Sequence, residues 1–177
     1  MRLAARLLFY PTLFYNLALC ALRPSWQWWN WVDGTVLLGA LSMGRHVPAL
    51  KSLGVTGVVN TCAEYAGPLA QYEQAGIEQF RVPTTDFTPP TVESIKSSLA
   101  FIERHAARGG KVYVHCKAGR GRSATVAICY LIARGLSPDE AQAKLSRVRP
   151  QVMRSLAKRK VVLDFAAERT PAAGLPA

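Results

Sequence analysis

Residues 115–125 read His-Cys-Lys-Ala-Gly-Arg-Gly-Arg-Ser-Ala-Thr, and the interpretation of the whole chain starts from this stretch. An apolar run precedes it and a helical pattern follows it, which predicts a turn between a strand and a helix. Gly119 and Gly121 allow the backbone to curl until successive N–H groups point inward. The N-terminus of the following helix is aimed at the same spot, which favours an anion. The segment 117–122 is therefore predicted to be a phosphate-binding loop, with Ala118 among its residues.

Two side chains of this turn add reactivity. Arg122 follows Cys116 by six positions, and its planar guanidinium can hold two phosphate oxygens, which a lysine cannot do. The same positive surroundings favour the thiolate of Cys116, because nearby cations and helix N-termini lower a cysteine pKa. A thiolate that faces a bound phosphate implies transfer of the phosphoryl group to sulfur, followed by hydrolysis. The other three cysteines have no arginine six positions later: Cys20, Cys62 and Cys129.

This two-step chemistry needs an acid for the departing alkoxide and a base for the attacking water, and one carboxyl group can serve both steps. Asp86 is the candidate, because it follows a strand predicted over 77–82 and should emerge at the same edge of a parallel sheet as Cys116. A capping role in the loop is its alternative. Ser123 can donate to the sulfur and stabilise it as a leaving group, or be an ordinary hydroxyl at a helix start. His115 is expected to orient the loop rather than act as a base.

Apolar runs and helical patterns alternate from Thr35 onward. Strands are predicted over 35–39, 55–60, 77–82 and 111–115. Helices are predicted around 47–53, over 68–75, 91–108, 121–133 and 151–167, and from 137 onward. This alternation predicts an α/β domain with a central, mostly parallel sheet of about four to five strands flanked by helices. The expected organisation is an N-terminal segment over 1–32, one folded domain over 33–169 and a flexible tail over 170–177.

The charge balance indicates the class of partner. The chain has 177 residues and a formal net charge of +11, which favours nucleic acid, an anionic membrane or a phosphorylated substrate. No zinc-finger or RNA-binding aromatic signature is present, so nucleic acid is not expected. The cysteines and histidines lack metal-ligand spacing, so neither a metal nor a cofactor is expected.

The N-terminal segment has a composition of its own. Residues 7–22 are uncharged, but as a helix they would span about 24 Å, short of the roughly 30 Å hydrocarbon core. All four tryptophans follow within six residues: Trp26, Trp28, Trp29 and Trp31. Tryptophan is typical of the membrane–water boundary. The segment is interpreted as an apolar, helical membrane-associating or targeting element; a secretory signal peptide and an element that packs on the domain are the alternatives.

The loop resembles the signature of the dual-specificity branch of the cysteine phosphatases, in which His-Cys is followed by five residues, an arginine and a serine or threonine. The layout is similar from about Thr35 to Ala167, with an acid thirty residues before the cysteine. The resemblance implies the cysteine-phosphatase fold and a dual-specificity phosphatase domain over 33–169.

A closer resemblance is to the mitochondrial protein-tyrosine-phosphatase-like phosphatidylglycerophosphate phosphatases. The segments that carry it are Phe9–Leu13, Val36–Leu41 and the loop itself, in which Gly121 stands where many members have serine. Glu64 and Tyr65 look like the family's substrate motif, which implies contact with the lipid headgroup. The resemblance implies conversion of phosphatidylglycerophosphate to phosphatidylglycerol, upstream of cardiolipin, at the matrix face of the inner mitochondrial membrane.

Charge within the loop agrees with a strongly anionic substrate. Lys117 and Arg120 add two cations, which suits a phospholipid headgroup with a phosphomonoester and a phosphodiester. Between residues 141 and 160 there are seven basic residues and no acid, and each can contribute about 1 kcal/mol near an anionic lipid surface. The alternatives are a phosphoinositide phosphatase, a dual-specificity protein phosphatase and a non-catalytic binding module.

Overall fold

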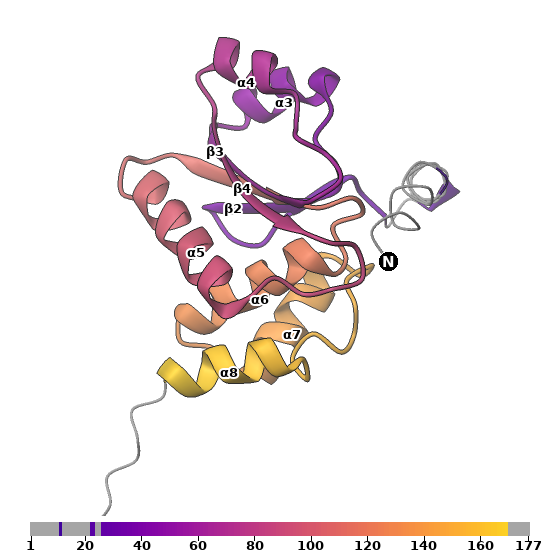
Figure 1. Ribbon diagram of the computed structural model, residues 1–177, viewed down its shortest axis with the longest axis vertical. Helices are drawn as coiled ribbons and strands as arrows, with labels where there is room; N and C mark the ends of the chain where they lie inside the picture. The colour runs from indigo at the N-terminus through magenta and orange to yellow at the C-terminus, as the bar shows by residue number, and fades with distance from the viewer. Residues whose placement is uncertain (1–10, 12–21, 24–25, 170–177) are drawn as a thin grey trace, which may run out of the picture.

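The computed structural model describes residues 11, 22–23 and 26–169. The apolar segment predicted to be helical, and the tail predicted over 170–177, lie outside these residues. The described chain forms a five-stranded sheet in the order β1-β2-β5-β3-β4 (Figure 1). The strands are β1 (Trp29–Trp31), β2 (Val36–Gly39), β3 (Val55–Cys62), β4 (Glu78–Thr84) and β5 (Lys111–His115). Only β1 pairs antiparallel, with β2. The predicted α/β architecture is confirmed.

Helices cover both faces of the sheet (Figure 1). One face carries the 3-10 helix η1 (Gly44–His46) and the short helices α3 (Val47–Ser52) and α4 (Leu69–Ala75). The other carries α5 (Val92–Ala106), α6 (Arg122–Ala133), α7 (Pro138–Val148) and α8 (Lys160–Arg169). The inner strands β2, β3 and β5 are buried on both sides, which is why the sequence shows apolar runs in them. In β2, Leu37 belongs to the core under α3 and α4, whereas Leu38 belongs to the larger core under α5–α8.

Local signals in the sequence account for several helix ends. Ser137 and Glu140 form a reciprocal capping box at the start of α7, and Thr91 accepts a hydrogen bond from the Ser94 amide at the start of α5. Gly76 ends α4 in the left-handed conformation, with φ of 64°. These short-range rules place the helices that frame the site.

The helix predicted over 151–167 is wrong in its first half. In the structure α8 begins only at Lys160, and residues 150–159 form turns. The Met153 amide donates to the Arg120 carbonyl at 3.0 Å, so this segment is bonded to the loop, while its own short-range bonds form isolated turns rather than a continuous helix. Three apolar residues of this segment are buried although it is not helical: Val152, Leu156 and Ala157.

The tryptophan-rich stretch belongs to the folded unit. Trp29–Trp31 is the edge strand β1, so the sheet begins before the boundary predicted after residue 32. The indole of Trp28 donates to the Leu41 carbonyl at 3.0 Å, and Trp29 packs edge-on against Tyr113 with the ring centroids 6.0 Å apart. These contacts agree with the packing alternative for the tryptophans. Within the described ranges, no helix has the length and apolar character needed to cross a bilayer.

Candidate active site

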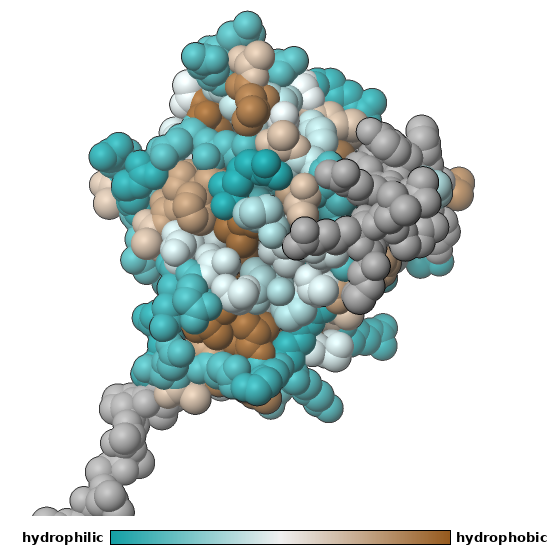
Figure 2. Space-filling model, in the orientation of Figure 1, coloured by the Kyte–Doolittle hydropathy of each residue, from teal (hydrophilic) through white to brown (hydrophobic). Residues whose placement is uncertain are grey.

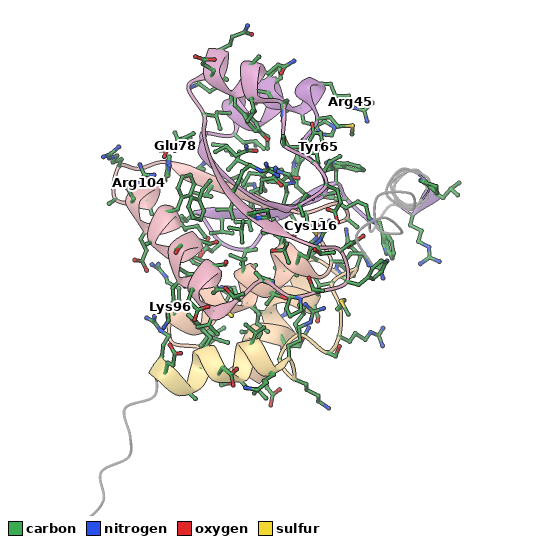
Figure 3. The ribbon with its side chains drawn as sticks, viewed as in Figure 1. Arg45, Tyr65, Glu78, Lys96, Arg104 and Cys116 are labelled. Atoms are coloured by element: carbon green, nitrogen blue, oxygen red, sulfur yellow. The ribbon has the colours of Figure 1, made fainter. Side chains whose placement is uncertain are left out.

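The loop after β5 brings the cysteine to the carboxyl edge of the sheet. Figure 3 shows Cys116 between the sheet and the start of α6. Gly119 has a φ of 67°, and a Cβ there would lie 2.4 Å from the Gly39 carbonyl oxygen, so both the conformation and the space require glycine. The Gly119 amide donates to the Cys116 sulfur at 3.2 Å. The loop therefore directs a backbone amide at the thiol, as the sequence predicts.

The environment of Cys116 favours the thiolate. The hydroxyl of Ser123 donates to the sulfur at 3.3 Å, in the position predicted for it. Burial opposes ionisation, but the charge of Arg122 and the hydrogen bonds from Ser123 and the loop amides outweigh it and lower the pKa of Cys116 to about 7. These surroundings thus favour the thiolate, which is the form that can attack phosphorus.

Arg122 is buried at the start of α6 and is held by two carboxylates. Its Nη1 donates to the Glu64 carboxylate at 2.7 Å and to the Thr84 carbonyl at 2.8 Å. Its Nη2 lies 3.0 Å from Asp86 Oδ1. The guanidinium is therefore fixed in orientation before any phosphate binds, so little side-chain entropy is lost on binding.

Asp86 lies in the loop between β4 and α5, at the same sheet edge as Cys116, as topology predicts. Its carboxylate pairs with Lys117 as well as with Arg122. These ion pairs hold the Asp86 carboxyl group at the wall of the pocket that also contains the Cys116 sulfur. An acid for the leaving oxygen is needed at this place.

The contact of Glu64 and Tyr65 with a lipid headgroup stays a prediction, and the structure gives Glu64 partners within the protein. Besides its bond to Arg122, the Glu64 carboxylate accepts from the Asp86 amide at 2.9 Å. It joins the arginine to the Asp86 loop and thereby positions both, a role that sequence reasoning missed. The ring of Tyr65 is partly buried and packs against the cluster that contains Cys62 and Cys116.

The remaining predicted residues are placed around the loop. His115 is buried, its ring stacks on Tyr113, and burial lowers its pKa to about 4, so it is neutral at physiological pH. Lys117 is buried, whereas Arg120 is exposed and its guanidinium lies over the Trp26 ring. Ala118 and Gly121 also line the pocket.

Arg149 binds the backbone of the phosphate-binding loop, and the sequence did not indicate this role. It is fully buried at the end of α7, where its Nε donates to the Gly119 carbonyl at 2.9 Å and its Nη2 to the Ala118 carbonyl at 3.1 Å. Its Nη1 donates to Asn30 Oδ1 at 2.7 Å, in β1. Because these partners lie 30 to 119 positions away in the sequence, no local pattern could have identified it.

The pocket at this site has a volume of about 440 Å³. Its walls come from 86–88, 116–118 and 120–122, together with Met153 and Arg159 from the turns before α8. No cluster of side chains suited to a metal ion occurs in the part of the chain that the structure describes. The arrangement combines a thiolate, an arginine, inward-pointing amides and a carboxyl group, which suffices for phosphoryl transfer to sulfur.

Comparisons with known proteins agree with this chemistry. The family model for the dual specificity phosphatase catalytic domain matches residues 36–167. The chain is 40% identical over 165 residues to phosphatidylglycerophosphate phosphatase PTPMT1 of Arabidopsis thaliana, covering 91% of this chain but only 49% of that protein. It is 39% identical over 170 residues to phosphatidylglycerophosphate phosphatase PTPMT2 of the same plant, covering 94% of this chain and 75% of the relative. The chain thus spans about half the length of the first of these relatives.

Solved structures resemble the fold closely. A crystal structure of PTPMT1 superposes with a TM-score of 0.72 at 34% identity, covering 80% of this chain and 95% of the other. A crystal structure of PTPMT1 in complex with PI(5)P gives the same TM-score at 32% identity, covering 80% and 96% of the two chains.

Proposed function

The chain belongs to the dual-specificity phosphatase family as a cysteine-based phosphatase, and from this premise we propose that it hydrolyses the phosphomonoester of phosphatidylglycerophosphate. The product would be phosphatidylglycerol, the precursor in cardiolipin synthesis. The observation that carries the proposal is the identity of about two residues in five with phosphatidylglycerophosphate phosphatases over nearly the whole chain. A phosphoinositide phosphatase is the second candidate, because a related structure holds PI(5)P.

The site supports a two-step mechanism. The Cys116 sulfur attacks phosphorus, an S–P bond forms, and the P–O bond to the lipid alkoxide breaks. Arg122 and the loop amides hold the other phosphate oxygens, while Asp86 gives its proton to the departing alkoxide. In the second step Asp86 takes a proton from water, the water oxygen bonds to phosphorus, and the sulfur leaves as thiolate with a hydrogen bond from Ser123.

A membrane surface is the proposed location of the substrate, at the matrix face of the inner mitochondrial membrane as the resemblance implies. On the face drawn in Figure 2, apolar residues form small groups separated by hydrophilic ones. Phe87 stands at the pocket with 77% of its surface exposed, and Met153 with 39%. Phe87 also has a φ of 67°, which is rare for a bulky residue and is more frequent where function requires it. Exposed cations lie near Met153 in the sequence: Arg154, Lys158 and Lys160.

The proposed substrate is tested with a panel. We expect phosphate release from phosphatidylglycerophosphate to be faster than from a phosphotyrosine peptide, because a cation-rich pocket suits a headgroup with two phosphates. We expect it to be faster than from phosphoinositides because of the identity with phosphatidylglycerophosphate phosphatases. The measurement is inorganic phosphate released by the wild-type chain under equal substrate concentrations. A strong preference for the peptide would overturn the lipid proposal, and a preference for phosphoinositides would establish the second candidate instead.

Phe87→Ala tests the proposed contact with a lipid surface. We expect about tenfold slower hydrolysis of phosphatidylglycerophosphate in vesicles, since burying a phenylalanine contributes about 1.5–3 kcal/mol, and a much smaller change with soluble nitrophenyl phosphate. Leu163→Ala is the matched control, because Leu163 is 49% exposed on α8 and lies outside the pocket. Equal losses on vesicles and on the soluble substrate would reject the membrane role of Phe87.

A further inference from the structure

A second positive group faces the pocket from outside the phosphate-binding loop. Arg159 comes from the turns before α8, and its side chain is half-buried at the pocket wall. A Cβ placed on Gly121 would lie 3.7 Å from Arg159 Nη2 and 3.2 Å from Met153 Sδ. Because Gly121 has no side chain, the guanidinium can approach the loop backbone and line the same space.

Arg159 uses only part of its N–H groups in hydrogen bonds within the protein, and the others can bind a ligand. Nη1 donates to the Thr125 hydroxyl at 2.9 Å, and Nη2 lies 3.0 Å from the Met153 sulfur, which is a weak acceptor. Among the described residues, no carboxylate forms a salt bridge with Arg159. Its charge is therefore not neutralised by a neighbouring acid, although the side chain is held in a fixed position.

The other cations at the pocket are engaged differently. Lys117 pairs with Asp86, and Arg122 pairs with both Glu64 and Asp86. Arg120 donates from Nε to the Gln151 carbonyl at 2.9 Å, and its guanidinium lies 5.2 Å from the centre of the Trp26 ring. Lys117 and Arg122 thus have carboxylate partners, and Arg120 is exposed and bound to a carbonyl and a ring. The half-buried Arg159 at the pocket wall is therefore the cation best placed for a second anion.

We propose that Arg159 and the open space over Gly121 form a second anion subsite, which binds the phosphodiester of the lipid headgroup while its phosphomonoester occupies the loop. This inference rests on the proposed function, because phosphatidylglycerophosphate carries these two groups on one glycerol. A guanidinium suits a phosphodiester, since two parallel N–H groups can meet its two unesterified oxygens. The subsite would select substrates that carry a second phosphate close to the first.

Arg159→Leu tests the subsite on three substrates: short-chain phosphatidylglycerophosphate, its deacylated headgroup and nitrophenyl phosphate. We expect kcat/KM for the two diester-bearing substrates to fall by about ten- to a hundredfold, mainly through KM, because a charge-assisted contact to a non-reacting group is lost. The fall for nitrophenyl phosphate should be at least tenfold smaller. The ratio of kcat/KM for the diester-bearing substrates to kcat/KM for nitrophenyl phosphate therefore decreases. Arg159→Lys should recover part of the ratio. Arg108→Leu is the control, since it removes the same charge from an exposed arginine just after α5, outside the pocket.

The outcomes separate the subsite from the proposed function. An equal loss on all three substrates, or no loss, would overturn the subsite. A loss on the lipid but not on its deacylated headgroup would also overturn it, because it would point to the membrane surface instead. If the wild type cleaves nitrophenyl phosphate but not phosphatidylglycerophosphate, the proposed function fails. In that case inhibition of nitrophenyl phosphate hydrolysis tests the subsite. Arg159→Leu should weaken inhibition by the deacylated headgroup more than inhibition by inorganic phosphate. Equal weakening of both would reject the subsite.

Discussion

Cys116→Ser is expected to lower the turnover of every phosphomonoester by on the order of 10⁴-fold or more, because a neutral hydroxyl replaces the nucleophile. The pKa of Cys116 is lowered to about 7 by Arg122 and Ser123 against the opposing effect of burial, whereas a serine hydroxyl has no such ionised form near neutral pH. The measurement is steady-state release of nitrophenol and of phosphate from the lipid substrate.

The control for this loss is Cys129→Ala, which changes another buried cysteine, in the middle of α6 and away from the pocket. It should keep its turnover at temperatures where it is folded, while Cys116→Ser should keep its thermal stability and lose turnover. If Cys116→Ser turned over substrate as fast as the wild type, the thiol mechanism would be wrong.

Asp86→Asn is expected to slow the hydrolysis of alkyl phosphates by about 10²–10⁴-fold, because the amide cannot give a proton to the departing alkoxide. Nitrophenol leaves without that help, so its initial burst, which reports the first step, should persist. The measurement compares single-turnover rates for a lipid or glycerol phosphate with those for nitrophenyl phosphate. Asp164→Asn serves as the control, since Asp164 pairs only with exposed Lys160 in the described structure. Equal slowing of both substrates in the first step would remove Asp86 from the role of acid.

The parts of the structure that the sequence predicts well depend on local rules. The strand over Lys111–His115 has the predicted bounds, since a short apolar run between a Gly-Gly pair and the loop leaves little choice. The position of Asp86 was predictable for a topological reason: parallel strands present their carboxyl ends at one edge, so the loops after β4 and β5 must meet.

The parts that could not be predicted depend on partners far away in the chain. The edge strand β1 has three residues, two of them tryptophans, and its strand conformation depends on pairing with β2. The turns over 150–159 contain several buried residues, and besides short-range turn bonds they are held by long-range hydrogen bonds to Arg120 and Thr125. Glu64 reaches Arg122 across 58 positions, so its positioning role is visible only once the sheet has formed.

The buried guanidinium of Arg149 has a consequence for the order in which the chain gains its function. It bonds to the carbonyls of Ala118 and Gly119 and to Asn30, so the loop has its final shape only when β1 and the end of α7 are both in place. During synthesis the loop emerges before Arg149 does. A partly made or partly folded chain therefore carries the thiol without its finished cradle, and reactivity toward phosphate esters arises only as folding is completed.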